Sequence, residues 1–99
     1  MNKIIYKYEI PLLSPEGVVI KLPKGAKILY AGMQRVNLRS ETEFETRIFI
    51  WAMVDPDAEL EPRTIHTVYT GVEFSQSAEY ISSFIDEHTR LVYHIFVGV

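Results

Sequence analysis

An arginine and three bulky apolar side chains alternate along one face of a predicted strand, roughly Thr46 to Val54. They are Arg47, Phe49, Trp51 and Met53. A guanidinium binds carboxylate or phosphate, an aromatic plane stacks on a base, and Trp, Met and Arg are enriched at interface centres. Arg47 and Trp51 lie roughly 13 Å apart along a strand, so they would serve different ends of a ligand or different subunits. The pattern indicates a subunit interface, a ligand groove, or a face covered by the rest of the chain.

Further polar side chains follow on two later predicted strands. Arg63, His66 and Tyr69 lie on "RTIHTVYT", and His94 lies on "RLVYHIFVGV". Arg63, His66 and Tyr69 could lie beside Arg47 if their strand pairs as a hairpin with the preceding strand, Thr46 to Val54. The short connection between the two strands suggests this pairing. The two histidines converge if their strands are adjacent. The plainer interpretation is that both arginines pair with acids of the flanking loops, and that each histidine is a satisfied core or edge residue.

Several chemistries are excluded by residue type and spacing. The chain has no cysteine, which removes disulfides, thiolate metal sites and cysteine nucleophiles. No two of the three histidines have the spacing of a local metal pair. The acidic run after Val54 lacks the glycine and the final glutamate of a calcium loop, because Leu60 and His66 stand there. We therefore expect no metal, no cofactor and no catalytic residue, although a dispersed active site stays open.

Length and charge limit the remaining functions. A chain of 99 residues forms one domain, spanning residues 1–99, because it has no material for a second core. Its net charge of −3 makes nucleic-acid binding unlikely, and we interpret the small cluster Lys21, Lys24 and Lys27 as a solvated hairpin edge. No segment approaches the apolar length of a membrane helix, and the first ten residues do not resemble a signal peptide. A cytoplasmic protein is expected.

Alternation with a period of two dominates the chain and predicts strands. "IIYKYEI" and "VVIKLP" are expected to pair as a hairpin, a third strand covers about Lys27 to Gln34, and residues 35–46 form a charged loop. The apolar positions of "SAEYISSFIDEH" suit either a strand or a short helix near 77–88, with the strand favoured. The predicted fold class is all-β, a small antiparallel sandwich or barrel of six to seven strands. Its core includes Ile48, Ile50, Ala52 and Val54.

Several short motifs occur in a fixed order along the chain. They are "IIYKYEIPL", "IKLPKGAKIL" with Gln34 closing that strand, "IWAMVDPDAELEPRT", "YTG", "EYI" and "LVYHIF". In this order the chain resembles a family of small uncharacterised domains found mostly in tailed bacteriophages. The resemblance implies that the "EYI" segment forms a hairpin with the final strand. It implies a phage setting and a host-cell cytoplasmic location, and it supplies no established activity or catalytic residues.

Three classes of function follow from these patterns. The first is a homo-oligomeric binding protein, with the Arg47 to Met53 face between subunits or lining a pocket for a small anionic ligand in counter-defence. The second is an inhibitor that binds a host protein through an edge strand or the charged loop, or a minor assembly factor. The third is an enzyme with a dispersed site. Stoichiometric binding needs no catalytic constellation, so the first class is preferred.

Overall fold

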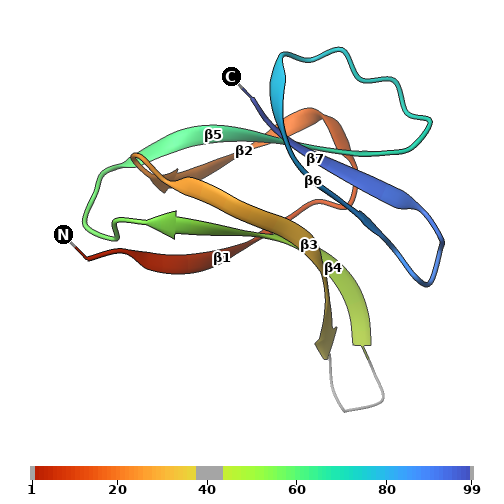
Figure 1. The fold of residues 1–99 in the computed structure, drawn as a ribbon, viewed down its shortest axis with the longest axis horizontal. Coiled ribbons are helices and arrows are strands. Elements are labelled where there is room, and N and C mark those ends of the chain that lie inside the picture. Colours follow the sequence, from red (N-terminus) through yellow and green to blue (C-terminus); the bar gives the residue numbers. More distant parts are fainter. Residues whose placement is uncertain (1, 38–43, 99) are drawn as a thin grey trace.

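Seven antiparallel strands form two sheets, and the computed structural model describes residues 2–37 and 44–98 (Figure 1). The three-stranded sheet has the order β1-β4-β3, with β1 (Ile4–Ile10), β4 (Phe44–Val54) and β3 (Lys27–Asn37). The four-stranded sheet has the order β2-β5-β7-β6, with bounds Ser14–Pro23, Leu60–Tyr69, Val92–Gly98 and Ala78–Ile85. The predicted all-β sandwich is confirmed. The described part of the chain contains no helix of the length and apolarity needed to cross a bilayer.

The segment that suited either strand or helix is β6, and it pairs with β7 from Ala78 opposite Gly98 to Ile85 opposite Val92. The alternative of a short helix near 77–88 is therefore wrong, and the hairpin with the final strand is confirmed. β7 needs an antiparallel neighbour on its outer edge, and this tertiary pairing outweighs the helical spacing of the apolar residues. Residues 35–37 and 44–46 of the predicted charged loop belong to β3 and β4, whereas 38–43 lie outside the described residues.

Two predicted hairpins are wrong, because each connection carries the chain from one sheet to the other. β1 pairs with β4 over seven consecutive residues, and β2 pairs with β5. β4 and β5 likewise lie in different sheets. The local alternation places one face of each strand inward, but it does not distinguish a neighbour within the sheet from a neighbour in the facing sheet.

The core lies between the two sheets. Ile48, Ile50, Ala52 and Val54 are 0% exposed, so their predicted burial is confirmed. A main cluster joins two of them to buried residues of the other sheet, namely Ile65, Tyr93, Ile95 and Val97. A smaller cluster surrounds Leu22 and Ala26 at one end. Each fully buried aliphatic side chain contributes about 1.5–3 kcal/mol, so these faces account for most of the stabilisation of the fold.

Ser82 joins the two sheets where the edges of β3 and β6 meet. Its hydroxyl donates to the carbonyl oxygen of Ala31 at 2.8 Å and accepts the Ala31 amide at 3.2 Å. Ser82 follows a register shift in the β6–β7 ladder, after Tyr80, which turns it toward β3. One side chain therefore satisfies both backbone groups that a neighbouring strand would otherwise take, and it closes this side of the sandwich.

We predict that Ser82→Ala lowers the free energy of unfolding by about 1–3 kcal/mol, because the amide and carbonyl of Ala31 lose their partner in a half-buried place. Urea unfolding measures this change. Ser83→Ala is the matched control on the same strand, since the Ser83 side chain is exposed. Equal losses for the two variants would contradict the bridging role of Ser82.

A second prediction concerns alkaline pH. Burial, and then the charge of Asp86, raise the pKa of the Tyr93 phenol above its ordinary value of 10.0. The folded state therefore holds this proton more tightly than the unfolded state. Its contribution to stability is full below pH 10 and is lost as the pH rises through the higher folded pKa. Stability measured by urea unfolding should fall above about pH 10, and Tyr93→Phe should reduce that fall.

Candidate functional site

The outward face of the three-stranded sheet gathers the four residues predicted on β4. The register places Lys7 of β1 and Tyr30 of β3 on either side of Trp51. We call this the outer face; its residues are Ile5, Lys7, Glu9, Lys27, Tyr30, Gly32, Gln34, Glu45, Arg47, Phe49, Trp51 and Met53. Ile5 is 55% exposed and Tyr30 is 51% exposed, so large apolar groups face solvent here. The opposite side of the same sheet is the core.

Phe49 is buried although it lies on the outer face, where it is only 7% exposed. The ammonium of Lys7 sits 4.6 Å from its ring centroid, which is cation–π geometry. The Trp51 ring lies 6.2 Å away, and Trp51 in turn contacts Tyr30 at 5.7 Å between ring centroids. Lys7 of β1 and Trp51 of β4 itself therefore contact the Phe49 ring.

Gly32 allows Tyr30 to lie across the sheet. A Cβ atom at Gly32 would stand 2.6 Å from the Tyr30 hydroxyl and 2.7 Å from a ring carbon. No side chain fits beneath the ring without displacing it, so the glycine at this position fixes how the aromatic group is arranged. Tyr30 was absent from the predicted site residues. Its contribution depends on a register shift between Ile28 and Tyr30 that the sequence does not reveal.

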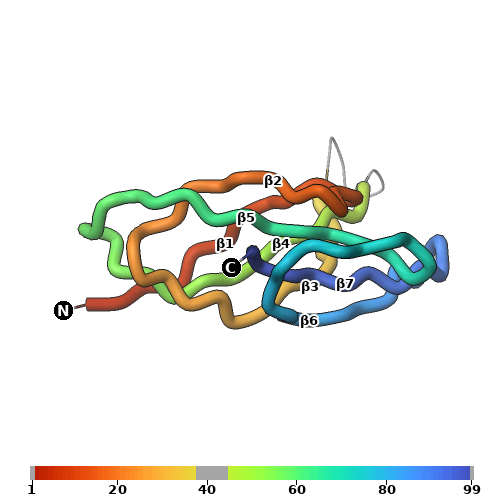
Figure 2. The backbone as a smooth tube through the Cα atoms, turned by 90° about the horizontal axis from the view of Figure 1, so that it is seen from above, coloured from red at the N-terminus to blue at the C-terminus, as the bar shows by residue number. Residues whose placement is uncertain are grey.

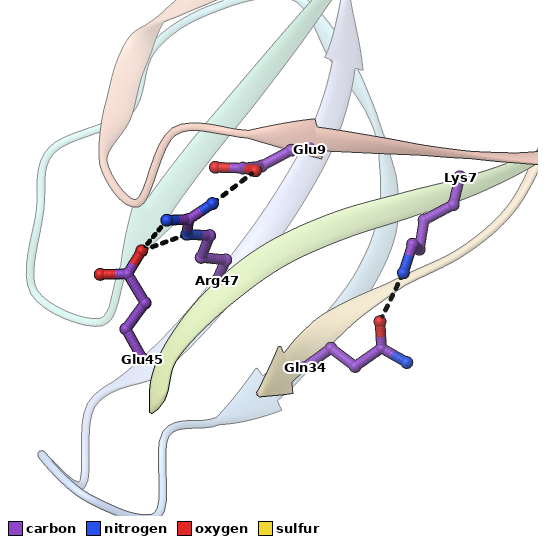
Figure 3. Close-up of polar contacts among 5 residues, drawn as sticks. All are labelled: Lys7, Glu9, Gln34, Glu45 and Arg47. Atoms are coloured by element: carbon purple, nitrogen blue, oxygen red, sulfur yellow. Dashed lines mark hydrogen bonds and ion pairs between the residues drawn. The ribbon is translucent and has the colours of Figure 1, made fainter. Parts of the chain in front are cut away.

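The charges of the outer face are paired with one another (Figure 3). Arg47 contacts Glu9 at 3.4 Å and also binds Glu45, and Lys7 donates to the Gln34 side chain at 2.9 Å. The hydrogen bond to Glu45, together with the negative charges of Glu45 and Glu9, raises the pKa of Arg47. The guanidinium thus lies between two carboxylates on the sheet itself, which supports the interpretation that it answers nearby acids.

Arg63 and Tyr69 do not join the outer face. Arg63 lies on the same side of β5 as the buried Ile65, donates to the carbonyl of Ala26 at 3.1 Å and pairs with Glu61 at 4.0 Å. Tyr69 packs edge-on against the buried Tyr93, with ring centroids 6.2 Å apart. The structure therefore does not assemble the predicted combination of Arg47 with polar groups of β5, because β5 belongs to the other sheet.

His66 and His94 lie on adjacent strands and on one face, the outside of the four-stranded sheet, but they bind different groups. His66 is 3% exposed, donates through Nδ1 to the carbonyl of Pro15 at 2.9 Å and packs against the Phe74 ring. The close approach of β2 here requires Gly17, at φ 98°, since a Cβ atom would lie 2.8 Å from the His66 ring. His66 is thus a buried structural residue.

His94 belongs to a chain of hydrogen bonds that the sequence did not reveal. Its Nδ1 is 2.7 Å from the Ser83 hydroxyl and its Nε2 is 2.9 Å from the Thr70 hydroxyl. Ser83 also contacts the Tyr80 hydroxyl at 2.9 Å. A serine beside a histidine resembles a nucleophile with its base, but the group that orients the imidazole is a hydroxyl. A hydroxyl does not stabilise an imidazolium as a carboxylate does. We interpret the chain as a surface polar network.

Two other features of the described residues bear on ligand chemistry. No three histidine, aspartate or glutamate side chains lie close enough together to hold a metal ion. An open groove of about 810 Å³ separates the end of the β3–β4 hairpin from the β6–β7 turn. Acidic and basic groups both line it, among them Arg35, Glu45, Glu87 and His88. This mixture of charges favours no single class of small molecule.

Comparison with known proteins assigns a family without an activity. Residues 1–99 match the family described as a domain of unknown function (DUF7352). The chain belongs to the DUF7352 family. No curated protein and no solved structure matches it. The proposals for this DUF7352 domain therefore rest on its own geometry.

We predict that Gly32→Ala displaces the Tyr30 ring and exposes Trp51, the only tryptophan of the chain. The ring is half exposed, so it can swing outward, and the loss of stability should be small. Trp51 emission should shift to longer wavelength, and acrylamide should quench it more strongly. Tyr30→Ala serves as the reference, because it removes the ring altogether. Stronger quenching in Tyr30→Ala but none in Gly32→Ala would show that the ring does not lie across Gly32.

Proposed function

We propose that this DUF7352 domain is a non-catalytic accessory binding protein that acts as a homo-oligomer and uses its outer face as the contact surface. The observation that supports this most is the pairing of charges around the half-buried Trp51 and the exposed Tyr30. Trp51 and Tyr30 provide contact area, while Arg47 and Lys7 are held by Glu45, Glu9, Gln34 and the Phe49 ring.

Internal pairing makes the outer face suited to burial against another protein. An unpaired charge loses its hydration when it is buried in an interface. This loss costs roughly several kcal/mol unless a group of the partner protein takes the place of the water. On the outer face each cation named above already has a partner from its own sheet. Apolar and aromatic side chains at the centre with paired charges around them are typical of interface cores and rims.

The arrangement of charge favours a second copy as the partner. Lys27 lies opposite Met53 at one end of the sheet, while Glu9, Glu45 and Arg47 lie toward the other end with two acids for one base. Positions 45 and 53 are about 26 Å apart along a strand. If two copies meet face to face about a two-fold axis across the strands, the basic end of each lies over the acidic end of the other.

Sequestration of a small anionic, nucleotide-like ligand is a finer version of the proposal. It would require phosphate to replace Glu45 and Glu9 around Arg47, and the other predicted cation, Arg63, lies on the core side of β5. A protein surface is therefore the better fit for the outer face. Calorimetric titration of cyclic and linear nucleotides into the unmutated protein tests the ligand version directly.

The phage setting of the proposal is supported by the ordered motifs described in the sequence analysis. Within that setting a stoichiometric binder would act in the host cytoplasm, in counter-defence, as an inhibitor of a host protein or as a minor assembly factor. A protein that is monomeric at all concentrations would favour the inhibitor, because its exposed aromatic face would then be available to a foreign partner.

We predict that the unmutated protein has at least twice the chain mass at micromolar concentration and that Trp51→Glu lowers this mass by breaking the outer-face contact. A carboxylate at position 51 would be buried without a partner in the interface. Size-exclusion chromatography with light scattering measures the mass. Tyr30→Glu, at an exposed position of the same face, should change the mass in the same way. It provides a second test in case Trp51→Glu does not fold. Tyr80→Glu, at an exposed tyrosine of the other sheet, should keep the oligomer. A mass unaffected by both outer-face variants would refute this contact.

A further inference from the structure

The two sheets have four edge strands, β1 and β3 in one and β2 and β6 in the other. An edge strand exposes unpaired amide and carbonyl groups, and folded proteins usually protect such edges with prolines, bulges, charges or covering chain. The four edges of this protein differ sharply in how far they are protected.

Three of the edges are interrupted. β2 contains Pro15 and Gly17, and its ladder shifts register between Ser14 and Val18. β3 and β6 each carry a register shift, and they approach one another through Ser82, which occupies both backbone groups of Ala31. Each of these edges departs from the regular geometry that another strand needs for continuous pairing.

β1 is the regular edge. Its seven residues pair one to one with β4 from Ile4 opposite Val54 to Ile10 opposite Ile48, without a shift, and they include no proline or glycine. In Figure 1 β1 runs along the lower margin of the molecule, away from β2, with no described element beyond it. Figure 2 shows its N-terminal end projecting from one end of the molecule. Ile4, Ile5 and Tyr6 are each at least 40% exposed.

We infer that the free edge of β1 pairs with β1 of a second copy, in antiparallel orientation, to give a continuous six-stranded sheet. Identical edges related by a two-fold axis perpendicular to the sheet are antiparallel, and they keep the same face of the sheet on the same side. The occupant is a second copy because the side chains of β1 complement themselves.

The charges of β1 select the register. Lys7 and Glu9 are the charged residues of the strand, and both point to the outer face. When Tyr8 faces Tyr8 of the second copy, Lys7 of each copy faces Glu9 of the other, which gives two opposite-charge pairs. A shift of one residue in each strand places Lys7 against Lys7 or Glu9 against Glu9. In the favoured register Tyr6, which is 40% exposed, lies opposite Ile10 of the second copy.

This edge contact deepens the proposed self-association and rests on it for the identity of the partner. It uses the main chain of β1 together with Lys7 and Glu9, which also belong to the outer face, whereas the face contact centres on Trp51 and Tyr30. A copy can make both contacts at once, so a tetramer is the expected complete assembly. Trp51→Glu should then leave the dimer that is held by β1.

Engineered disulfides test the register in a chain that has no cysteine of its own. Lys7→Cys and Glu9→Cys are purified separately and mixed in equal amounts under mild oxidation. Residues directly opposite across strands have Cβ atoms about 4.5–5.5 Å apart, near disulfide distance, whereas diagonal neighbours are about 7–8 Å apart and too far. We expect the mixture to form the disulfide-linked dimer about tenfold faster than either variant alone. Lys21→Cys mixed with Glu79→Cys, on the two edges of the other sheet, is the control and should not cross-link.

The outcomes separate the two contacts. Cross-linking in the mixture that persists when both proteins also carry Trp51→Glu supports the edge contact independently of the outer face. The β1 pairing is overturned if the mixture and the single variants cross-link at equal rates, or if no cross-linking occurs at a protein concentration of 100 µM. If the same samples still have an oligomeric mass, the face contact remains supported. As a second measurement, Lys7→Glu should weaken the dimer, and the exchange Lys7→Glu with Glu9→Lys should restore it. Failure of the exchange to restore it would also count against this register.

Discussion

The fold depends on β4, whose inner face is fully buried and whose outer face carries one buried ring, Phe49. On the inner face four small aliphatic side chains, Ile48, Ile50, Ala52 and Val54, pack against the other sheet. On the outer face Phe49 is covered by side chains of its own sheet, with the Lys7 ammonium over one aromatic ring and Tyr30 beside another. A central strand with two apolar faces can be accommodated in a domain of 99 residues only if one face is sealed without a third layer of chain. The positions of Lys7, Tyr30 and Gly32 follow from that requirement.

The same requirement explains why the polar residues occupy separate places. Arg47 is held on the sheet surface by Glu9 and Glu45, whereas Arg63 closes the end of the smaller core cluster by donating to Ala26. His66 fills a buried position beneath the close approach of β2, and His94 lies in an exposed chain of hydroxyls. Each of these side chains has a hydrogen-bond partner from nearby chain, and the four do not converge on one site.

The sequence predicts local features of this fold well and its pairings poorly. The alternation of Ile48, Ile50, Ala52 and Val54 is sufficient to predict their burial, because side chains alternate strictly across a strand. The partner of β1 is not predictable in this way. "IIYKYEI" alternates equally well beside β2 or β4, and the choice is made by packing between segments more than thirty residues apart. The burial of Phe49 likewise depends on Lys7, which reaches its ring from β1, and the contact of Tyr30 with Trp51 depends on a bulge in β3.

The pairing of β1 with β4 also has a consequence in time. β1 leaves the ribosome before its partner strand, Phe44–Val54. Synthesis proceeds at about 5–20 residues per second, so roughly 2–10 s pass before β4 has been made. β2 similarly waits for β5. Sheets built from such distant segments have a high contact order and fold slowly, on a scale of milliseconds to seconds. During this interval the chain exposes an unpaired "IIYKYEI" segment, whose free backbone groups are open to pairing with other nascent chains.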